Sequence, residues 1–284
     1  MLNIGVRAHD FGKMNPKELS ESVSRYGFGH IQLALKKAVA GISDDHGKLS
    51  PGMGNYLEDC FLKKGIRISV LGCYINPVHP DSRERAIHLE RFTEHLLYAR
   101  SFGCSIVGTE TGSPLPDCSY TDRIYNEETF QDFIASLRVL VAAAEKTGTI
   151  AAIEGVADKN CIYSHERLKR TLELIPSPNL GIIYDPVNFL PSSREKESDG
   201  LMKEAFEMFA PKIVAVHAKD YRMENGRKDG TLPAGRGKLN YHLLLDLIRF
   251  YKPWVPVLLE NNSPGTMEES LGFIKSIEKE LTTP

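Results

Sequence analysis

The chain has 284 residues, of which 42% are hydrophobic, and this is enough for one large core. Barrels of this length commonly form one domain, so we expect a single domain over residues 1–284. The formal net charge of -2 includes no basic block and gives no reason to expect a nucleic-acid partner. We find no run of eighteen apolar residues and no charged leader before a long apolar stretch, so we expect neither a membrane span nor a secretory signal.

The cysteines argue for a reducing environment. They are odd in number and form no C-x-x-C pair: Cys60, Cys73, Cys104, Cys118 and Cys161. A disulfide framework or a structural zinc knot is therefore not expected. Free thiols of this kind predict a cytoplasmic protein.

Apolar runs of strand length alternate with amphipathic helical patterns through the first half. The runs are rich in Ile and Val and lack polar alternation, which is typical of buried parallel strands. Asn15 before Pro16 marks a helix start, and Gly103 and Gly148 mark helix ends. The predicted order is strand Asn3–Ala8, helix Pro16–Tyr26, strands His30–Ala34 and Ile66–Gly72, helix Ser82–Phe102, strand Ser105–Thr109 and helix Glu127–Lys146.

The second half continues the same alternation. Two polar stretches, Ser192–Gly200 and Tyr221–Lys238, are interpreted as insertions at strand ends. The predicted order is strand Thr149–Glu154, helix Ser164–Ile175, strands Leu180–Asp185 and Ile213–His217, helix Tyr241–Tyr251, strand Pro256–Glu260 and helix Thr266–Leu281. Eight strands with intervening helical segments predict an α/β fold, a (β/α)8 TIM barrel. An open doubly wound sheet is disfavoured because the turn after the first strand lacks a glycine-rich fingerprint.

Four of the predicted strands end in a residue that binds metals: Glu154, Asp185, His217 and Glu260. Successive gaps span about one strand–helix unit, so a parallel barrel would bring these strand ends to one face. Each residue shares its side of the strand with a small or apolar residue two positions earlier, as a barrel interior requires. Any one of them could be an ordinary polar strand end, but four together favour a divalent ion held by oxygen and nitrogen ligands.

Short motifs around these residues resemble the xylose isomerase-like barrel superfamily, which includes sugar phosphate isomerases and epimerases. They are Ile153-Glu-Gly155, Tyr184-Asp-Pro-Val-Asn188, Val216-His-Ala-Lys-Asp220, Leu258-Leu-Glu-Asn261 and Val107-Gly-Thr-Glu-Thr-Gly112. The likeness covers essentially the whole chain. It implies that Glu154, Asp185, His217 and Glu260 bind one divalent ion, which is Mn, Mg, Co or Zn. It also implies that Glu154 and Glu260 act as the catalytic pair that moves a proton.

The resemblance implies a metal-dependent sugar isomerase or epimerase. Such an enzyme moves a proton at a carbon next to a carbonyl of a ketose or related polyol, through a metal-stabilised enediolate. Return of the proton to the other face gives epimerisation, and return to the adjacent carbon gives isomerisation. Loss of a β-hydroxyl gives dehydration, so a cyclitol dehydratase or isomerase of the inosose type stays open. The expected partner is a small sugar-like substrate, with no nucleic acid or membrane, and family members often form homo-oligomers.

Five further polar residues are candidate substrate contacts: His79, Glu110, Asn188, Lys219 and Arg236. They follow predicted strand ends, where loops carry function on this fold. Each also has a simpler interpretation. His79 could be a surface loop histidine, Glu110 could pair with a nearby cation, and Arg236 could be a solvated loop arginine. His9 and Asp10 are weaker candidates at the end of the first strand.

Two other functions are alternatives for a chain of this kind. An apurinic endonuclease-type phosphodiesterase shares the barrel but uses extra histidine ligands, and this chain has Asn188 and Glu110 at two of those places. A non-catalytic sugar-binding barrel is the other alternative, because fold alone does not fix function.

Overall fold

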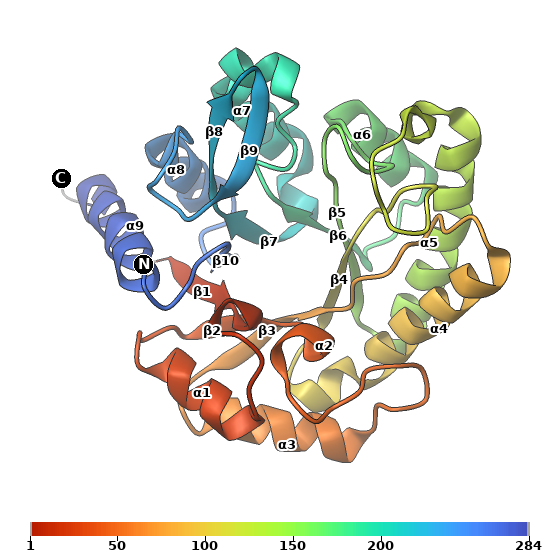
Figure 1. The fold of residues 1–284 in the computed structure, drawn as a ribbon, viewed down its shortest axis with the longest axis horizontal. Helices are drawn as coiled ribbons and strands as arrows, with labels where there is room; N and C mark the ends of the chain where they lie inside the picture. Colours follow the sequence, from red (N-terminus) through yellow and green to blue (C-terminus); the bar gives the residue numbers. More distant parts are fainter. Residues whose placement is uncertain (1, 283–284) are drawn as a thin grey trace.

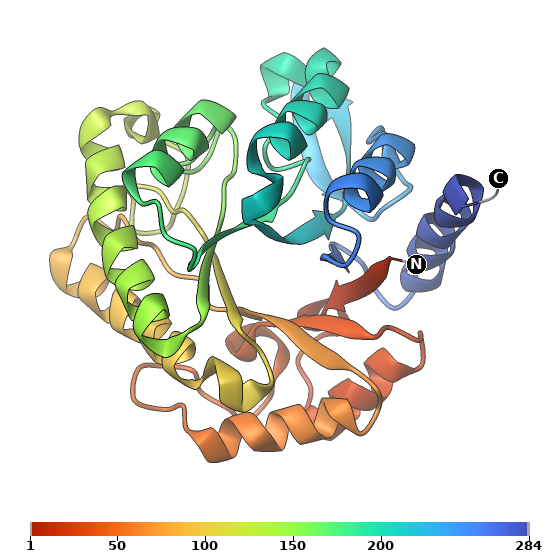
Figure 2. The same cartoon turned by 180° about the vertical axis from the view of Figure 1, so that it is seen from behind.

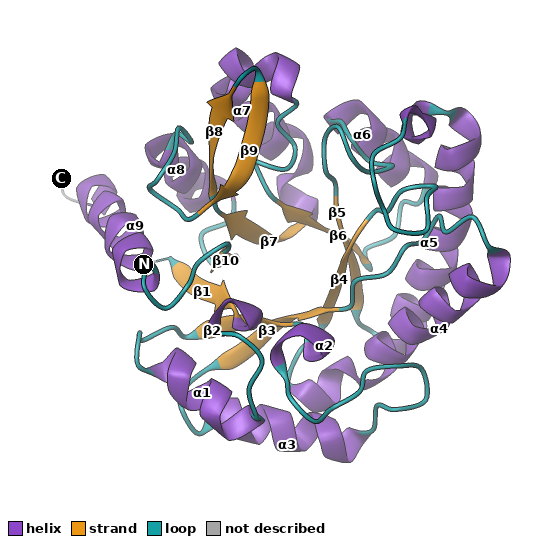
Figure 3. Ribbon diagram, in the orientation of Figure 1, coloured by secondary structure: helices purple, strands orange, loops and turns teal. Residues whose placement is uncertain are grey.

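Eight parallel strands close a barrel at the centre of the molecule. The computed structural model describes residues 2–282, and the strands lie in the order β1-β10-β7-β6-β5-β4-β3-β2 (Figure 3). Their bounds are β1 Asn3–Arg7, β2 His30–Leu33, β3 Arg67–Gly72, β4 Ile106–Glu110, β5 Ile150–Glu154, β6 Leu180–Tyr184, β7 Ile213–Ala218 and β10 Pro256–Leu259. Each agrees with a predicted strand to within one residue at either end, and the predicted (β/α)8 barrel is confirmed.

Helices surround the barrel on its outside (Figures 1 and 2). They are α1 Pro16–Ser24, α2 Leu35–Ala38, α3 Pro51–Leu62, α4 Ser82–Tyr98, α5 Glu127–Thr147, α6 His165–Leu174, α7 Ser198–Phe209, α8 Tyr241–Tyr251 and α9 Met267–Thr282. Short 3-10 turns are η1 Ala8–Phe11, η2 Ala99–Phe102, η3 Asp122–Tyr125, η4 Ser192–Glu197 and η5 Ala210–Lys212. Within residues 2–282, none of the helices combines the length and the apolar character that a bilayer crossing needs.

Local sequence explains where several helices begin and end. The Asn15 side chain accepts a hydrogen bond from the Glu18 amide, 3.0 Å away, and Pro16 follows in the first turn. Asp81 caps α4 in the same way through the amides of Arg83 and Glu84. Gly148 adopts a left-handed conformation with φ of 65° directly after α5, where a side chain would be strained. These caps satisfy backbone groups that the helix itself leaves unpaired.

Two separate apolar layers line the strands. One layer packs between strands and helices, and the other fills the barrel interior with Val70, Ala152, Ile183, Ala215 and Leu258. All five interior side chains are at most 1% exposed. Because side chains alternate along a strand, the residue two positions after four of these interior residues also points inward. Those next residues are the four predicted ligands: Glu154, Asp185, His217 and Glu260.

The two polar insertions are more ordered than a loop interpretation implies. Ser192–Gly200 forms η4 and the first turn of α7, and Tyr221–Lys238 contains most of the antiparallel pair β8 (Asp220–Glu224) and β9 (Arg227–Leu232). The Lys228 ammonium of β9 donates to the carbonyls of Val187 and Leu190, which ties the hairpin to the segment after β6. Both insertions therefore follow strand ends as predicted, but they add structure beside the mouth of the barrel.

The interior layer makes Leu258 a test of the barrel core. Leu258→Ala would leave a cavity in a closed interior, and we expect a loss of about 2–5 kcal/mol in the free energy of unfolding. Phe250→Ala is the matched control, because that side chain is 79% exposed and its loss should change stability by less than about 0.5 kcal/mol. Urea titration measures both values. Equal effects for the two variants would contradict the assignment of Leu258 to the core.

Candidate functional site

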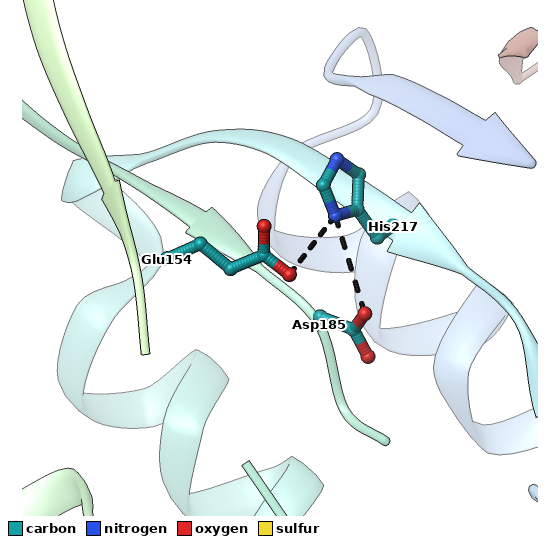
Figure 4. A group of neighbouring side chains, drawn as sticks. All are labelled: Glu154, Asp185 and His217. Carbon is teal, nitrogen blue, oxygen red and sulfur yellow. Dashed lines mark hydrogen bonds and ion pairs between the residues drawn. The ribbon is translucent and has the colours of Figure 1, made fainter. Parts of the chain in front are cut away.

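The four predicted ligands lie together at the carboxyl ends of β5, β6, β7 and β10. Glu154 is the last residue of β5, Asp185 and Glu260 directly follow β6 and β10, and His217 is near the end of β7. None of the four is more than 4% exposed. Three of them are drawn in Figure 4, where Glu154 and Asp185 approach the imidazole of His217 from neighbouring strands. The barrel thus gathers three buried acids around one histidine.

One ring nitrogen is the point on which the acids converge. His217 Nδ1 lies 3.2 Å from Glu154 Oε1, 3.2 Å from Glu260 Oε1 and 4.0 Å from Asp185 Oδ2. Burial alone would lower the pKa of His217, but the charges of Glu260, Glu154 and Asp185 raise it to about 9. The ring is therefore protonated at neutral pH in the protein without an ion, and its charge offsets part of the negative charge.

Two more cations hold Glu260. Arg7 Nη1 is 3.1 Å from Glu260 Oε1, and Lys219 Nζ is 3.0 Å from Glu260 Oε2. Burial would raise the pKa of Glu260, but His217, Lys219 and Arg7 together hold it well below its usual value. Burial also raises the pKa of Glu154, but here His217 offsets only part of the effect, and the nearby Glu260 and Asp185 raise the pKa further. The two glutamates predicted to be catalytic thus occupy opposite electrostatic environments.

Backbone and amide groups orient the other two acids. The amides of Val187 and Asn188 donate to Asp185 Oδ1 at 2.8 and 2.9 Å. The Asn188 side chain donates to Glu154 Oε1 at 2.6 Å. Asp185 Oδ2 is buried without a hydrogen bond of good geometry, although the Lys219 ammonium lies 2.8 Å away as an ion pair. This oxygen is available to a further positive group.

A divalent ion fits this arrangement. One ligand atom from each of Glu154, Asp185 and His217 lies within 4.8 Å of the others, which is the spacing that shared coordination of one ion requires. Glu260 falls outside this compact group because Arg7 and Lys219 draw its oxygens aside, yet it still reaches the same imidazole nitrogen. An ion among these oxygens would relieve the repulsion between three buried carboxylates.

The predicted substrate residues are distributed unevenly. Lys219 and Asn188 contact the acids directly, and Glu110 ends β4 in register with Glu154, where it accepts from Asn160 Nδ2 at 3.1 Å. His79 instead packs its ring edge against His88 and bonds to the backbone of Asp81. Arg236 is about half exposed and pairs with Glu269 of α9. In this structure those last two residues make no contact with the three acids or His217, and their substrate roles stay predictions.

The weaker candidates and several unforeseen residues line the β1–β3 side of the mouth. Asp10 pairs with Arg7 at 2.9 Å, and the His9 ring meets Tyr74 edge to face. Burial, reinforced by Arg7 and Lys37, lowers the pKa of His9 to about 3, so this ring is neutral. Arg7 itself and Gln32 were not predicted. The sequence does carry a signal for both residues, because each is a polar residue at an inward-facing position of a buried strand.

A concave region elsewhere carries none of this chemistry. It has a volume of about 560 Å³ and lies on the outer side of the barrel, lined by residues of α4 such as Leu89, Thr93 and Leu97. None of its lining residues contacts the three acids or His217. We therefore locate the candidate site by its buried charges, since concavity alone indicates a different and mostly apolar place.

Known structures share this fold. The 3-keto-D-glucoside 4-epimerase of E. coli superposes with a TM-score of 0.73 and 17% identity, over 97% of this chain and 100% of the epimerase. A D-tagatose 3-epimerase-like protein gives 0.75 and 18%, over 98% of each chain. A xylose isomerase-like TIM barrel protein of Mycobacterium smegmatis, in complex with magnesium, gives 0.75 and 17%, over 99% of this chain and 98% of that one.

At these identities the superpositions establish the fold and nothing finer. No protein with a curated description matches the chain. The family model described as the xylose isomerase-like TIM barrel matches residues 21–277, which is most of the sequence. The chain therefore belongs to the xylose isomerase-like TIM barrel family.

Proposed function

We propose that this protein is a divalent-metal-dependent sugar isomerase or epimerase. It moves a proton at a carbon next to a carbonyl of a ketose or a related polyol. The observation that carries the proposal is the convergence of three buried carboxylates and His217 at the mouth of the barrel, with two glutamates approaching the same imidazole nitrogen. Structural relatives whose names include sugar epimerases support the choice of substrate class.

The proposed cofactor is one divalent ion held by Glu154, Asp185 and His217, with Glu260 as the fourth ligand. Two or three carboxylates with one imidazole suit Mn, Mg, Co or Zn. When bound, the ion would polarise the carbonyl of the substrate and lower the cost of removing the neighbouring proton. A magnesium complex of a structural relative is consistent with this choice.

The residues of the chain supply the proton transfer. Glu154 and Glu260 come from β5 and β10, which are separated in the barrel by β6 and β7, so they flank the ring of His217 from two sides. A sugar carbon between them faces a carboxylate on each side. One carboxylate removes the proton and the other returns one, which inverts the carbon. Asn188 holds Glu154, and Arg7 and Lys219 hold Glu260, so each carboxylate has a fixed direction.

The direct test is hydrogen exchange with a panel of substrates. The protein is incubated in heavy water with ketoses, phosphorylated ketoses and inosose-type cyclitols, each with and without Mn²⁺. We expect deuterium to enter one C–H position of at least one compound, only when Mn²⁺ is present, and the product then separates epimerisation, isomerisation and dehydration. If the protein binds Mn²⁺ but exchanges no compound in the panel, a sugar-binding barrel without catalysis becomes the better reading.

Glu154→Gln tests the proton-transfer role when exchange is assayed at saturating Mn²⁺, because Glu154 is also a proposed metal ligand. The amide keeps the shape of the side chain but cannot accept the substrate proton, so exchange should fall by about 10²–10⁴-fold. Glu173→Gln is the matched control, because this exposed glutamate pairs with Lys169 of the same helix, α6. Manganese content after dialysis is measured for each protein. Wild-type exchange in the Glu154 variant would remove this residue from the mechanism.

Metal binding should release a proton from His217. With a pKa of about 9, the ring is protonated at pH 7, and an ion can use Nδ1 only after that proton leaves. We expect release of about one proton per ion bound at pH 7, and tighter binding as the pH rises toward 9. Calorimetry in two buffers of different ionisation enthalpy measures the release, and His242→Gln should behave as wild type. Tight binding at pH 7 without proton release would contradict coordination through His217.

A further inference from the structure

The second nitrogen of His217 has a partner from the far side of the barrel. Gln32 lies on the inward row of β2, is 1% exposed, and places its Oε1 2.7 Å from His217 Nε2. Its other end, Nε2, donates to the hydroxyl of Tyr74 at 3.0 Å. Both polar ends of this buried amide are therefore engaged, and the amide is fixed between Tyr74, two residues after β3, and His217 of β7.

This contact determines which ring nitrogen is free for an ion. An imidazole that binds an ion through Nδ1 must carry its only proton on Nε2. A buried N–H without an acceptor costs free energy, and here Gln32 Oε1 is the acceptor. Rotation of the ring would break this bond and would also turn Nδ1 away from Glu154 and Glu260. The amide thus fixes both the tautomer and the ring orientation.

The choice of an amide at this position also follows from charge. Three carboxylates already face the imidazole from the other side, and a fourth at hydrogen-bond distance would add another buried negative charge. The Gln32 carbonyl accepts the same hydrogen bond without that charge. Its amino group is directed to the Tyr74 hydroxyl, which keeps the oxygen turned toward His217.

We propose that Gln32 is a positioning residue for the metal site, acting through His217 and not by contact with the substrate. The inference rests on the proposed function, since it needs a divalent ion at Glu154, Asp185 and His217. Contacts of this kind with a ligating histidine typically change metal affinity by about 10–100-fold when they are removed. Tyr74 has the lesser role of orienting the amide.

The test compares the affinity for Mn²⁺ and Mg²⁺ in four proteins by calorimetry. Gln32→Met keeps the length of the side chain but removes the acceptor, and its affinity should fall by about 10–100-fold. Gln32→Glu keeps an acceptor, so we expect affinity within about threefold of wild type or tighter, while the added buried negative charge should lower the stability of the metal-free protein. Tyr74→Phe leaves the contact between Gln32 and His217 in place and should also stay within about threefold. Thermal unfolding of each metal-free protein shows whether the fold is retained.

Each outcome decides the inference. Weak binding in the methionine variant with recovery in the glutamate variant supports it, whereas a purely structural role would lower stability and leave the affinity of folded protein unchanged. Equal affinities for wild type and Gln32→Met would overturn the positioning role while the proposed function stands. Equal weakening in the methionine and glutamate variants would also overturn it, because packing and not the acceptor would then matter. If wild type binds neither ion, the proposed function itself fails and this inference fails with it.

Discussion

Three buried carboxylates facing one imidazole nitrogen are the constraint on which the rest of the site depends. Like charges at this spacing repel strongly in a barrel interior, where little water screens them. Part of this negative charge is offset by His217 itself, by Lys219 and Arg7 beside Glu260, and by backbone amides that donate to Asp185. A bound divalent ion would complete this compensation, and Asp185 Oδ2, which pairs with Lys219 but accepts no hydrogen bond of good geometry, is an oxygen that could bind it.

The barrel supports this arrangement because its interior is closed below the acids. Val70, Ile183 and Leu258 fill the layer beneath them and exclude water from that side. The acids can therefore be approached only from the carboxyl ends of the strands. The alternation of side chains along a strand explains both the closed core and the charged mouth. On β5, β6, β7 and β10 the inward residue that fills the core is followed, two positions later, by the inward residue that carries a charge.

Much of the fold follows from the sequence because strand and cap signals are local. Runs such as those leading to Glu154 and His217 are largely apolar. Asn15 marks a helix start through its side-chain cap, and Gly148 marks a helix end through its left-handed backbone. Helix α3 was not located, since glycines and polar residues interrupt its pattern. Helix α7 was not predicted either, since its start lies in the polar stretch Ser192–Gly200. The hairpin β8–β9 is polar and exposed on much of its surface, so its pairing leaves only a weak pattern of apolar alternation.

The grouping of the four candidate ligands could be predicted because order along the chain maps directly onto neighbouring strand ends. The contacts across the barrel could not, since Gln32 and His217 are far apart in sequence and only closure of the sheet brings them together. The directions of His79 and Arg236 depend on nearby partners, His88 and Glu269, that no motif reveals.

Crystals of the protein grown with Mn²⁺, with anomalous scattering recorded at the manganese edge, test the central claim most directly. The account predicts one strong peak among Glu154, Asp185 and His217, with Glu260 adjacent. A strongest peak elsewhere, with these side chains ordered and no ion between them, would contradict it.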